Sequence, residues 1–357
     1  MAPWRTVDCD ALEAAARERL TQVAYDYYAG GAEDESTLAD NIAAWRRIRL
    51  RPHVLRDVSV VDTAGTVLGT PVRAPILVAP TAYQRLAHDE GEVATARGTA
   101  AADTVLVVST LATVRLEEVA AAAPQAPRWM QIYLQRDRGA TADLVARAVA
   151  VGYRALVLTV DLPVPANRRR DERNGFALPP GMLLSNLGIA HPAMPGGGSA
   201  LAAHIVQDFT PAITFDDIGW LAEISGLPVV VKGVLRGDDA AACVAAGGAA
   251  VIVSNHGGRQ LDGAIATADA LPEVCDAVAG RAEVYVDGGL RSGTDVLKAL
   301  AAGAQAVLLG RPVLWGLAVG GAAGVQAVLD GYVRELATAM AMCGAIDLAG
   351  LTADLLT

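Results

Sequence analysis

The sequence predicts a closed (β/α)8 barrel, and three observations support this fold class. Eight short apolar runs recur from about residue 75 onward, they alternate with Ala-rich stretches of helical period, and nearly every run ends in polar or Gly residues. Eight strands with helical connections between them are the number that closes such a barrel. A doubly wound open sheet is the alternative, but it would gather chemistry at one or two crevices rather than at every strand end.

The expected strands follow one another at regular intervals. They are Ile76–Ala79, Thr104–Val108, Arg128–Leu134, Ala155–Val160, Val229–Val231, Ala250–Val253, Glu283–Val286 and Ala306–Leu309. Between them the helical period predicts helices, among them Glu90–Ala102, Ala142–Val151, Asp238–Ala246 and Gly293–Ala302. Because barrel active sites are assembled from the carboxyl ends of strands, the polar residues that follow these runs are the candidates for chemistry.

Two segments stand outside this repeat, although residues 1–357 are expected to form a single domain with the barrel over 73–357. Residues 1–72 predict an N-terminal extension that serves as a lid or plug, with a helix over about Cys9–Tyr28, a second near Ser36–Trp45 and a β-like segment over Val58–Val72. The connection over about residues 162–213 is far longer than usual and rich in Pro and Gly, so we expect a mobile loop that covers a site.

Composition narrows the possible partners. The chain has 357 residues, 53% of them hydrophobic, which is enough for a large core, and its net charge of −10 argues against nucleic acid or an anionic membrane as the main partner. Four widely spaced cysteines and histidines without partners at ligand spacing predict buried thiols and no metal site. The first residues lack the apolar stretch of a secretory signal, so the expected location is cytoplasmic.

The most specific stretch is Ser254-Asn-His-Gly-Gly-Arg-Gln-Leu-Asp262. It places the imidazole of His256 and the guanidinium of Arg259 three residues apart just past a strand, and a base beside a carboxylate-binding group is what proton abstraction from a hydroxy acid needs. A polar loop whose histidine caps a turn is the alternative. Asp161, at another strand end, either supports a protonated His256 or merely starts the turn before Pro163.

The last two strand ends predict a phosphate-bearing ligand. Asp287-Gly-Gly-Leu-Arg291 precedes a helix from Gly293, and Gly310-Arg311 precedes a second helix. Barrels commonly hold a phosphate at this place with glycine N–H groups, a helix N-terminus and arginine. Plain turn glycines are the alternative.

Two basic features of the sequence have more than one interpretation. Lys232, one of only two lysines, ends an apolar strand and is a Schiff-base amine, a fixed charge beside an electron-accepting ring, or a lysine that reaches bulk water. Arg168-Arg-Arg170 opens the long connection and is either a solvated face or an anion gate.

Nine stretches of the sequence, spread over nearly the whole chain, resemble the FMN-dependent (S)-2-hydroxy acid oxidase/dehydrogenase family, whose fold is a (β/α)8 barrel. They are Tyr25-Asp-Tyr-Tyr-Ala-Gly-Gly-Ala-Glu-Asp-Glu35, Pro80-Thr-Ala82, Ala87-His-Asp-Glu-Gly-Glu92, Gln131-Ile-Tyr133, Leu158-Thr-Val-Asp161, Val231-Lys-Gly233, Ser254 to Asp262, Asp287-Gly-Gly289 and Gly310-Arg-Pro312. This resemblance implies one FMN-binding domain over residues 1–357.

The resemblance also implies roles, position by position. His256 would be the base that takes a proton from the substrate, with Asp161 supporting the imidazolium, and Lys232 would stabilise negative charge on the flavin. Substrate contacts would come from Tyr27, Tyr133, Arg168 and Arg259. Flavin contacts would come from Pro80, Thr81, Ala82, Ser109, Gln131, Thr159, Lys232, Ser254, Asp287, Gly288, Gly289, Arg291, Gly310 and Arg311.

Departures from the family pattern concern the substrate. Leu111 stands where short-chain glycolate oxidases carry a tryptophan, and Tyr83 replaces a commonly aliphatic residue, so an aromatic acid such as (S)-mandelate or (S)-4-hydroxymandelate is expected. The implied reaction yields the 2-keto acid and, with O₂ as acceptor, H₂O₂. A dehydrogenase that passes electrons to a quinone or carrier and a Lys232 Schiff-base lyase are the alternatives, and the resemblance implies a homo-oligomer, a tetramer.

Overall fold

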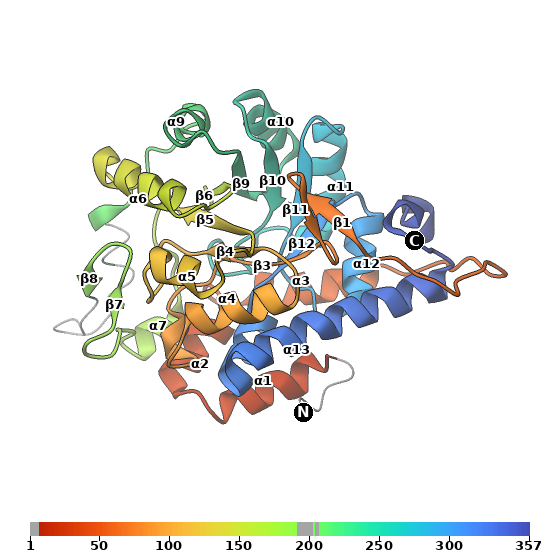
Figure 1. The fold of residues 1–357 in the computed structure, drawn as a ribbon, viewed down its shortest axis with the longest axis horizontal. Coiled ribbons are helices and arrows are strands. Elements are labelled where there is room, and N and C mark those ends of the chain that lie inside the picture. Colours follow the sequence, from red (N-terminus) through yellow and green to blue (C-terminus); the bar gives the residue numbers. More distant parts are fainter. Residues whose placement is uncertain (1–6, 191–202, 204–206) are drawn as a thin grey trace.

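The computed structural model describes residues 7–190, 203 and 207–357, and its centre is a closed barrel of eight parallel strands (Figure 1). The strands occur around the barrel in the order β3, β4, β5, β6, β9, β10, β11 and β12, after which β12 pairs with β3. Their bounds are Ile76–Val78, Leu106–Val108, Arg128–Ile132, Leu156–Thr159, Val229–Val234, Ala250–Val253, Glu283–Val286 and Ala306–Leu309. The predicted fold class is confirmed.

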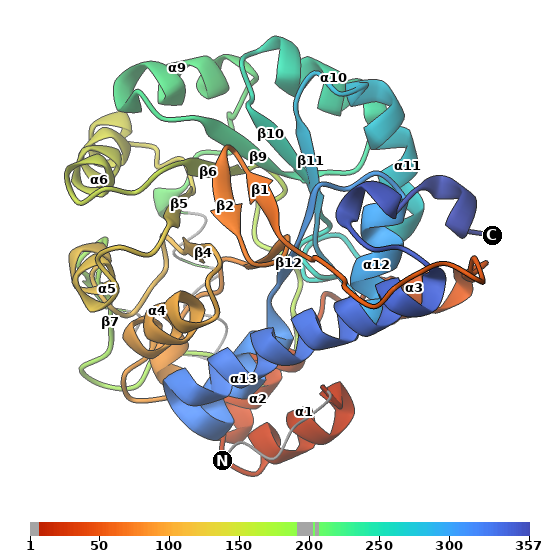
Figure 2. The ribbon, with the colours of Figure 1, turned by 45° about the vertical axis from the view of Figure 1, so that its right-hand side comes forward.

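Helices surround the barrel on its outer side (Figures 1 and 2). They are α4 (Glu92–Ala101), α5 (Leu116–Ala122), α6 (Arg138–Ala150), α9 (Asp216–Ser225), α10 (Gly237–Ala245), α11 (Thr267–Val278), α12 (Gly293–Ala301) and α13 (Arg311–Cys343). By length and composition α13 could cross a membrane, but 61% of its most apolar window is buried inside the molecule. Its apolar surface is therefore used in packing, and a kink at Gly320 and Gly321 interrupts its helical geometry.

The barrel interior has an apolar lower layer and a polar upper layer. The lower layer includes Trp129 and Tyr285, fully buried with ring centroids 6.0 Å apart. Side chains on a strand alternate between its two faces, so the residue two positions further on points into the same interior. At those positions the strands carry Gln131 and Asp287, and the carboxyl end of the barrel is therefore the polar end.

The N-terminal extension differs from its prediction in two places. The single helix expected over Cys9–Tyr28 is two helices, α1 (Cys9–Arg17) and α2 (Gln22–Ala29), because the Thr21 side chain accepts a hydrogen bond from Ala24 N and starts a new helix. The β-like segment is shorter than predicted and forms a hairpin of β1 (Gly65–Val67) and β2 (Thr70–Val72). The valines of this hairpin pack on the lower layer and close the bottom of the barrel (Figure 2). Helix α3 spans Ser36–Arg47, close to its prediction.

The long connection after β6 contains ordered elements of its own. It holds the short helix α7 (Arg169–Arg173) and an antiparallel pair of two-residue strands, β7 (Leu183–Leu184) and β8 (Ile189–Ala190). Residues 208–210 are tied to the end of β5, since Arg136 N donates to Asp208 O at 2.8 Å and Thr210 N donates to Leu134 O at 3.0 Å. The Gly-rich stretch at Pro195–Gly198, part of the predicted loop, lies outside the described residues.

Candidate active site

A cavity of about 1020 Å³, counted out to its open mouth, lies at the carboxyl ends of the barrel strands. Most of the residues predicted for the site line it, namely Tyr27, Pro80, Thr81, Ala82, Ser109, Tyr133, Arg168, Lys232, His256, Arg259, Asp287, Gly288, Gly289, Arg291, Gly310 and Arg311. The barrel thus brings residues from almost the whole length of the chain together in one cavity at the strand ends, as predicted.

The other predicted residues, Gln131, Thr159, Ser254 and Asp161, lie directly behind this lining. Gln131 and Thr159 are buried and joined by a hydrogen bond from Gln131 Nε2 to Thr159 Oγ1 at 3.2 Å, and Ser109 Oγ bonds Gln131 Oε1 at 3.3 Å. They form a chain of polar groups across three neighbouring strand ends. Their predicted contacts with the flavin stay predictions.

His256 and Asp161 form the central acid–base pair. His256 Nδ1 lies 2.8 Å from Asp161 Oδ1, so the carboxylate fixes the orientation of the ring. Burial lowers the pKa of His256 below its ordinary value, and although Asp161 opposes this, the imidazole is a neutral base at pH 7. The pKa of Asp161 is also lowered, because His256 and Lys232 together outweigh the effect of burial. The pair is therefore a base with a carboxylate behind it.

The backbone at His256 is left-handed. His256 has φ 58°, and Gly257 and Gly258 follow with φ 64° and 74°. A side chain on Gly258 would also meet Leu38 backbone atoms of α3 at 2.6 Å, so the loop packs tightly beneath the N-terminal extension. Such conformations are costly for residues other than glycine and cluster at functional sites.

Lys232 is a buried cation with fixed partners. Its Nζ lies 3.2 Å from Asp287 Oδ2 and donates to Ser254 Oγ at 2.9 Å, and the same hydroxyl accepts from His256 N at 3.1 Å. Burial alone would lower the pKa of Lys232, but Asp287 and Asp161 outweigh it and hold the pKa above its ordinary value. A protonated lysine is a poor nucleophile, so the geometry favours a fixed positive charge over a Schiff-base amine.

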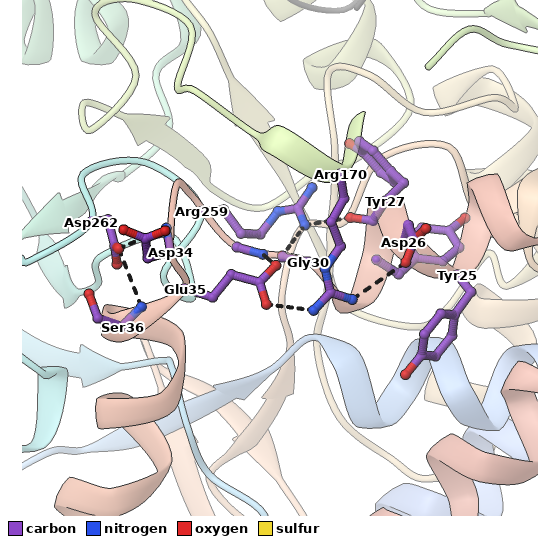
Figure 3. A network of polar contacts seen from close by, with 12 residues as sticks. Tyr25, Asp26, Tyr27, Gly30, Asp34, Glu35, Ser36, Arg170, Arg259 and Asp262 are labelled. Carbon is purple, nitrogen blue, oxygen red and sulfur yellow. Dashed lines mark hydrogen bonds and ion pairs between the residues drawn. The ribbon is translucent and has the colours of Figure 1, made fainter. Parts of the chain in front are cut away.

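Two arginines that line the cavity contact each other. Arg259 Nη1 donates to the carbonyl oxygens of Tyr27 at 2.5 Å and Gly30 at 2.9 Å, which lie at the negative end of α2 (Figure 3). Arg168 Nε donates to Arg259 O at 3.1 Å. Because each guanidinium carries five N–H donors, both keep donors free of these contacts, as carboxylate binding requires.

The Arg168–Arg170 run divides into two functions. Arg168 lines the cavity, whereas Arg169 pairs with Asp34. Arg170 pairs with Glu35 at 2.5 Å and with Asp26 at 3.4 Å (Figure 3). The latter two arginines therefore join α7 to the N-terminal extension and are neither a plain solvated face nor a three-arginine gate. Sequence reasoning missed this, because the acidic partners lie more than 130 residues away.

At the predicted phosphate end the backbone requires glycine, and the two helix N-termini differ from each other. Gly289 has φ 82°, and a Cβ there would meet Asn41 O at 2.1 Å, so only glycine fits. The N-terminus of α12 is already satisfied, since Arg291 N donates to Asp295 Oδ2 at 2.9 Å and Gly293 N to Glu335 Oε2 at 2.8 Å. The N-terminus of α13, which no side chain caps, opens into the cavity instead.

Arg311 completes this end of the cavity. It donates to the carbonyls of Tyr28 at 2.9 Å, Gly257 at 3.0 Å and Gly30 at 2.9 Å. Arg259 and Arg291 also line the cavity, so three guanidinium groups are gathered here. Burial and the charges of these two neighbours lower the pKa of Arg311. Concentrated buried positive charge is complementary to a phosphate.

Several lining residues were not predicted, because apolar side chains at strand ends look like core. Leu162, Leu290, Leu309 and Leu314 form apolar walls, and Tyr28 lines the cavity beside Tyr27. Among the residues that the structure describes, no group of three or more His, Cys, Asp or Glu side chains could hold a metal ion.

The histidine–aspartate pair, the two arginines and the buried lysine form a site that could bind an organic acid beside an anionic, phosphate-bearing cofactor. The family model described as FMN-dependent dehydrogenase matches residues 16–357. The chain therefore belongs to the FMN-dependent 2-hydroxy acid oxidase/dehydrogenase family, and its cofactor is FMN, as the sequence resemblance implied.

Relatives of this chain are oxidases of 2-hydroxy acids. It is 54% identical to an L-lactate oxidase from Nostoc sp., over 93% of each chain, and 48% identical to 2-hydroxyacid oxidase 1 from Homo sapiens, over 95% of this chain and 93% of the human protein. A crystal structure of mandelate oxidase with (S)-4-hydroxymandelic acid superposes with a TM-score of 0.92 at 43% identity, covering 98% of this chain and 97% of the other.

Proposed function

We propose that this enzyme oxidises an aromatic (S)-2-hydroxy acid, (S)-mandelate or (S)-4-hydroxymandelate, to the 2-keto acid, with O₂ as acceptor and H₂O₂ as product. The observation that supports the aromatic substrate is the apolar wall beside the base. Leu111 and Leu162 line the cavity together with Tyr133 and His256, and a leucine at position 111 leaves more room than the tryptophan expected for short-chain acids. An apolar wall of this kind suits a phenyl ring.

The residues of the cavity fit FMN. Asp287 Oδ1 is buried without a hydrogen-bond partner in the described part of the chain, and a ribityl hydroxyl would satisfy it. In this proposal Gly289, Arg291 and Arg311 would hold the phosphate, and Lys232 would stabilise the negative charge that the flavin gains. When bound, FMN supplies the acceptor for the two electrons that leave the substrate.

The side chains supply binding and proton transfer. Arg168 and Arg259 bind the substrate carboxylate, and the hydroxyls of Tyr27 and Tyr133 bond the carboxylate and the α-hydroxyl. His256 accepts the proton, and Asp161 stabilises the imidazolium that results. The Tyr133 hydroxyl stays protonated as a donor, because burial and Asp161 raise its pKa.

A visible spectrum of the purified holoenzyme tests the proposal. Anaerobic (S)-mandelate should bleach the flavin, and air should restore the colour with release of peroxide. Bleaching by (S)-lactate but not by (S)-mandelate would overturn the aromatic substrate, and slow recovery in air without peroxide would favour the dehydrogenase alternative. Leu111→Trp provides a matched variant, which should lose activity on (S)-mandelate while retaining that on (S)-lactate, since the larger side chain narrows only the apolar end.

We also propose a homo-oligomer, a tetramer, located in the cytoplasm. Val54, Leu55 and Val60 are 79%, 102% and 77% exposed. Their segment is joined to the end of α13 and the residues after it, since His53 N donates to Cys343 O at 3.2 Å and Asp62 N donates to Ile346 O at 2.8 Å. An exposed apolar cluster of this kind supports burial against another copy. Four free cysteines support a reducing compartment. Light scattering should give the mass of a tetramer, and Leu55→Asp should lower it.

A further inference from the structure

The three phenylalanines of the chain all lie on the connection between β6 and α9 or at its end. Phe176 and Phe209 are buried, with 1% and 4% of their surface exposed, whereas Phe215, at the start of α9, is 45% exposed. Each of the two buried rings stacks on one of the two tyrosines assigned to the substrate.

Phe176 holds the ring of Tyr27. The two rings are stacked, with centroids 4.4 Å apart and planes 16° apart. The ring of Tyr27 also contacts the ring of Tyr83, with the two centroids 5.2 Å apart. The guanidinium carbon of Arg259 lies 4.8 Å from the centroid of the Tyr27 ring. The carbonyl of Tyr27 is also fixed by Arg259. Arg259 thus fixes the backbone of Tyr27, and Phe176 makes the shortest of these contacts with its ring.

Phe209 holds the ring of Tyr133 in the same way. The rings are stacked with centroids 5.0 Å apart and planes 28° apart. Phe209 also pairs with Gln135 in an isolated antiparallel bridge, so its backbone is anchored next to the strand end that carries Tyr133. A stacked ring limits the angle that the tyrosine ring can adopt, and with it the position of the hydroxyl.

We propose that Phe176 and Phe209 are positioning residues that fix the hydroxyl groups of Tyr27 and Tyr133 for the substrate. The inference rests on the proposed role of these tyrosines in binding the hydroxy acid. Neither phenylalanine lines the cavity, so each acts through its tyrosine. Hydrogen bonds to a bound acid depend on donor position within a few tenths of an ångström, and a loosened ring therefore weakens binding without removing the donor.

The test replaces the flat ring and keeps apolar volume. Phe176→Leu and Phe209→Leu should each raise KM for whichever of (S)-mandelate and (S)-lactate reduces the holoenzyme by about 2- to 10-fold, the range that one aromatic pair corresponds to. FMN content should stay unchanged. Phe215→Leu is the matched control and should leave KM unchanged, and Phe176→Tyr, which keeps the stacked face, should restore most of the loss.

A double-mutant cycle separates positioning from general damage. In a Tyr27→Phe background the hydroxyl is absent, so Phe176→Leu should add little to KM. Equal KM values for Phe176→Leu, Phe209→Leu and Phe215→Leu would overturn the inference, as would fully additive effects in the cycle. If instead Tyr27→Phe and Tyr133→Phe themselves leave KM unchanged, the proposed substrate role of the tyrosines fails and the inference falls with it.

Discussion

The lower and upper layers of the barrel interior are built on the same strands and differ by only two residues in the chain. On β5 the step is from Trp129 to Gln131, and at β11 it is from Tyr285 to Asp287, which directly follows the strand. The lower side chains pack against one another and against the β1–β2 hairpin. The upper layer buries polar groups instead, and Asp287 Oδ1 and Asp161 Oδ2 have no partner among the described residues. Unpartnered buried groups cost stability, so the lower layer stabilises the fold while the upper layer is shaped for a ligand.

The largest expected effect of this division lies in the upper layer. His256→Ala should keep its FMN, because the residues proposed to hold the cofactor are unchanged, but should slow reduction of the flavin by substrate about 10²- to 10⁴-fold, the usual contribution of a general base. Anaerobic stopped-flow absorbance measures this rate. Normal reduction in the variant would show that the upper layer does not contain the base.

In the lower layer the same kind of truncation should change stability and not chemistry. Trp129→Ala removes a fully buried ring and should lower the free energy of unfolding by about 3–5 kcal/mol, measured by urea denaturation of the holoenzyme. The folded fraction should retain the KM of the unmodified enzyme. A large change of KM would mean that packing in the lower layer and chemistry in the upper layer are coupled.

The barrel was predictable because its signal is local. Apolar runs placed the eight strands within two or three residues, and the polar residues after them placed the site. His256 and Asp161 meet because β6 and β10 both pair with β9, an order that follows from a barrel in which the connection after β6 contributes no barrel strand. The break between α1 and α2 was missed, since a single Thr21 cap decides it.

Partners without a side-chain pattern could not be predicted. Arg259 and Arg311 are held by backbone carbonyls at the end of α2, and any sequence of suitable backbone geometry offers the same carbonyls. The stacking of Phe176 on Tyr27 joins residues that are far apart in the sequence. Neither kind of contact produces a pattern in the local sequence, so both are known only from the folded structure.

A smaller effect concerns pH. The base acts when His256 is neutral, and burial lowers its pKa, so kcat/KM should stay high until the pH falls below the ordinary histidine range. Asp161→Asn removes the main influence that raises this pKa. The acidic limb of kcat/KM should therefore move to still lower pH, while the plateau falls because the imidazolium loses its carboxylate. A limb that moves to higher pH would contradict the pairing.

The smallest effect compares two neighbouring arginines outside the barrel interior. Arg170 joins Asp26 and Glu35 on either side of the turn that carries the Gly30 carbonyl, whereas Arg169 pairs with Asp34, whose side chain is 77% exposed. Arg170→Gln should loosen that turn, and with it Arg259, and raise KM about 2- to 5-fold, the range expected for a partly exposed ion pair. Arg169→Gln has the same change of charge and should leave KM nearly unchanged. Steady-state kinetics at low and high salt distinguishes a specific effect of the Arg170 contacts from a general loss of positive potential. A general loss of potential would raise KM in both variants, and high salt would abolish the effect. Loss of the Arg170 contacts would raise KM in Arg170→Gln only, and the increase would persist in high salt.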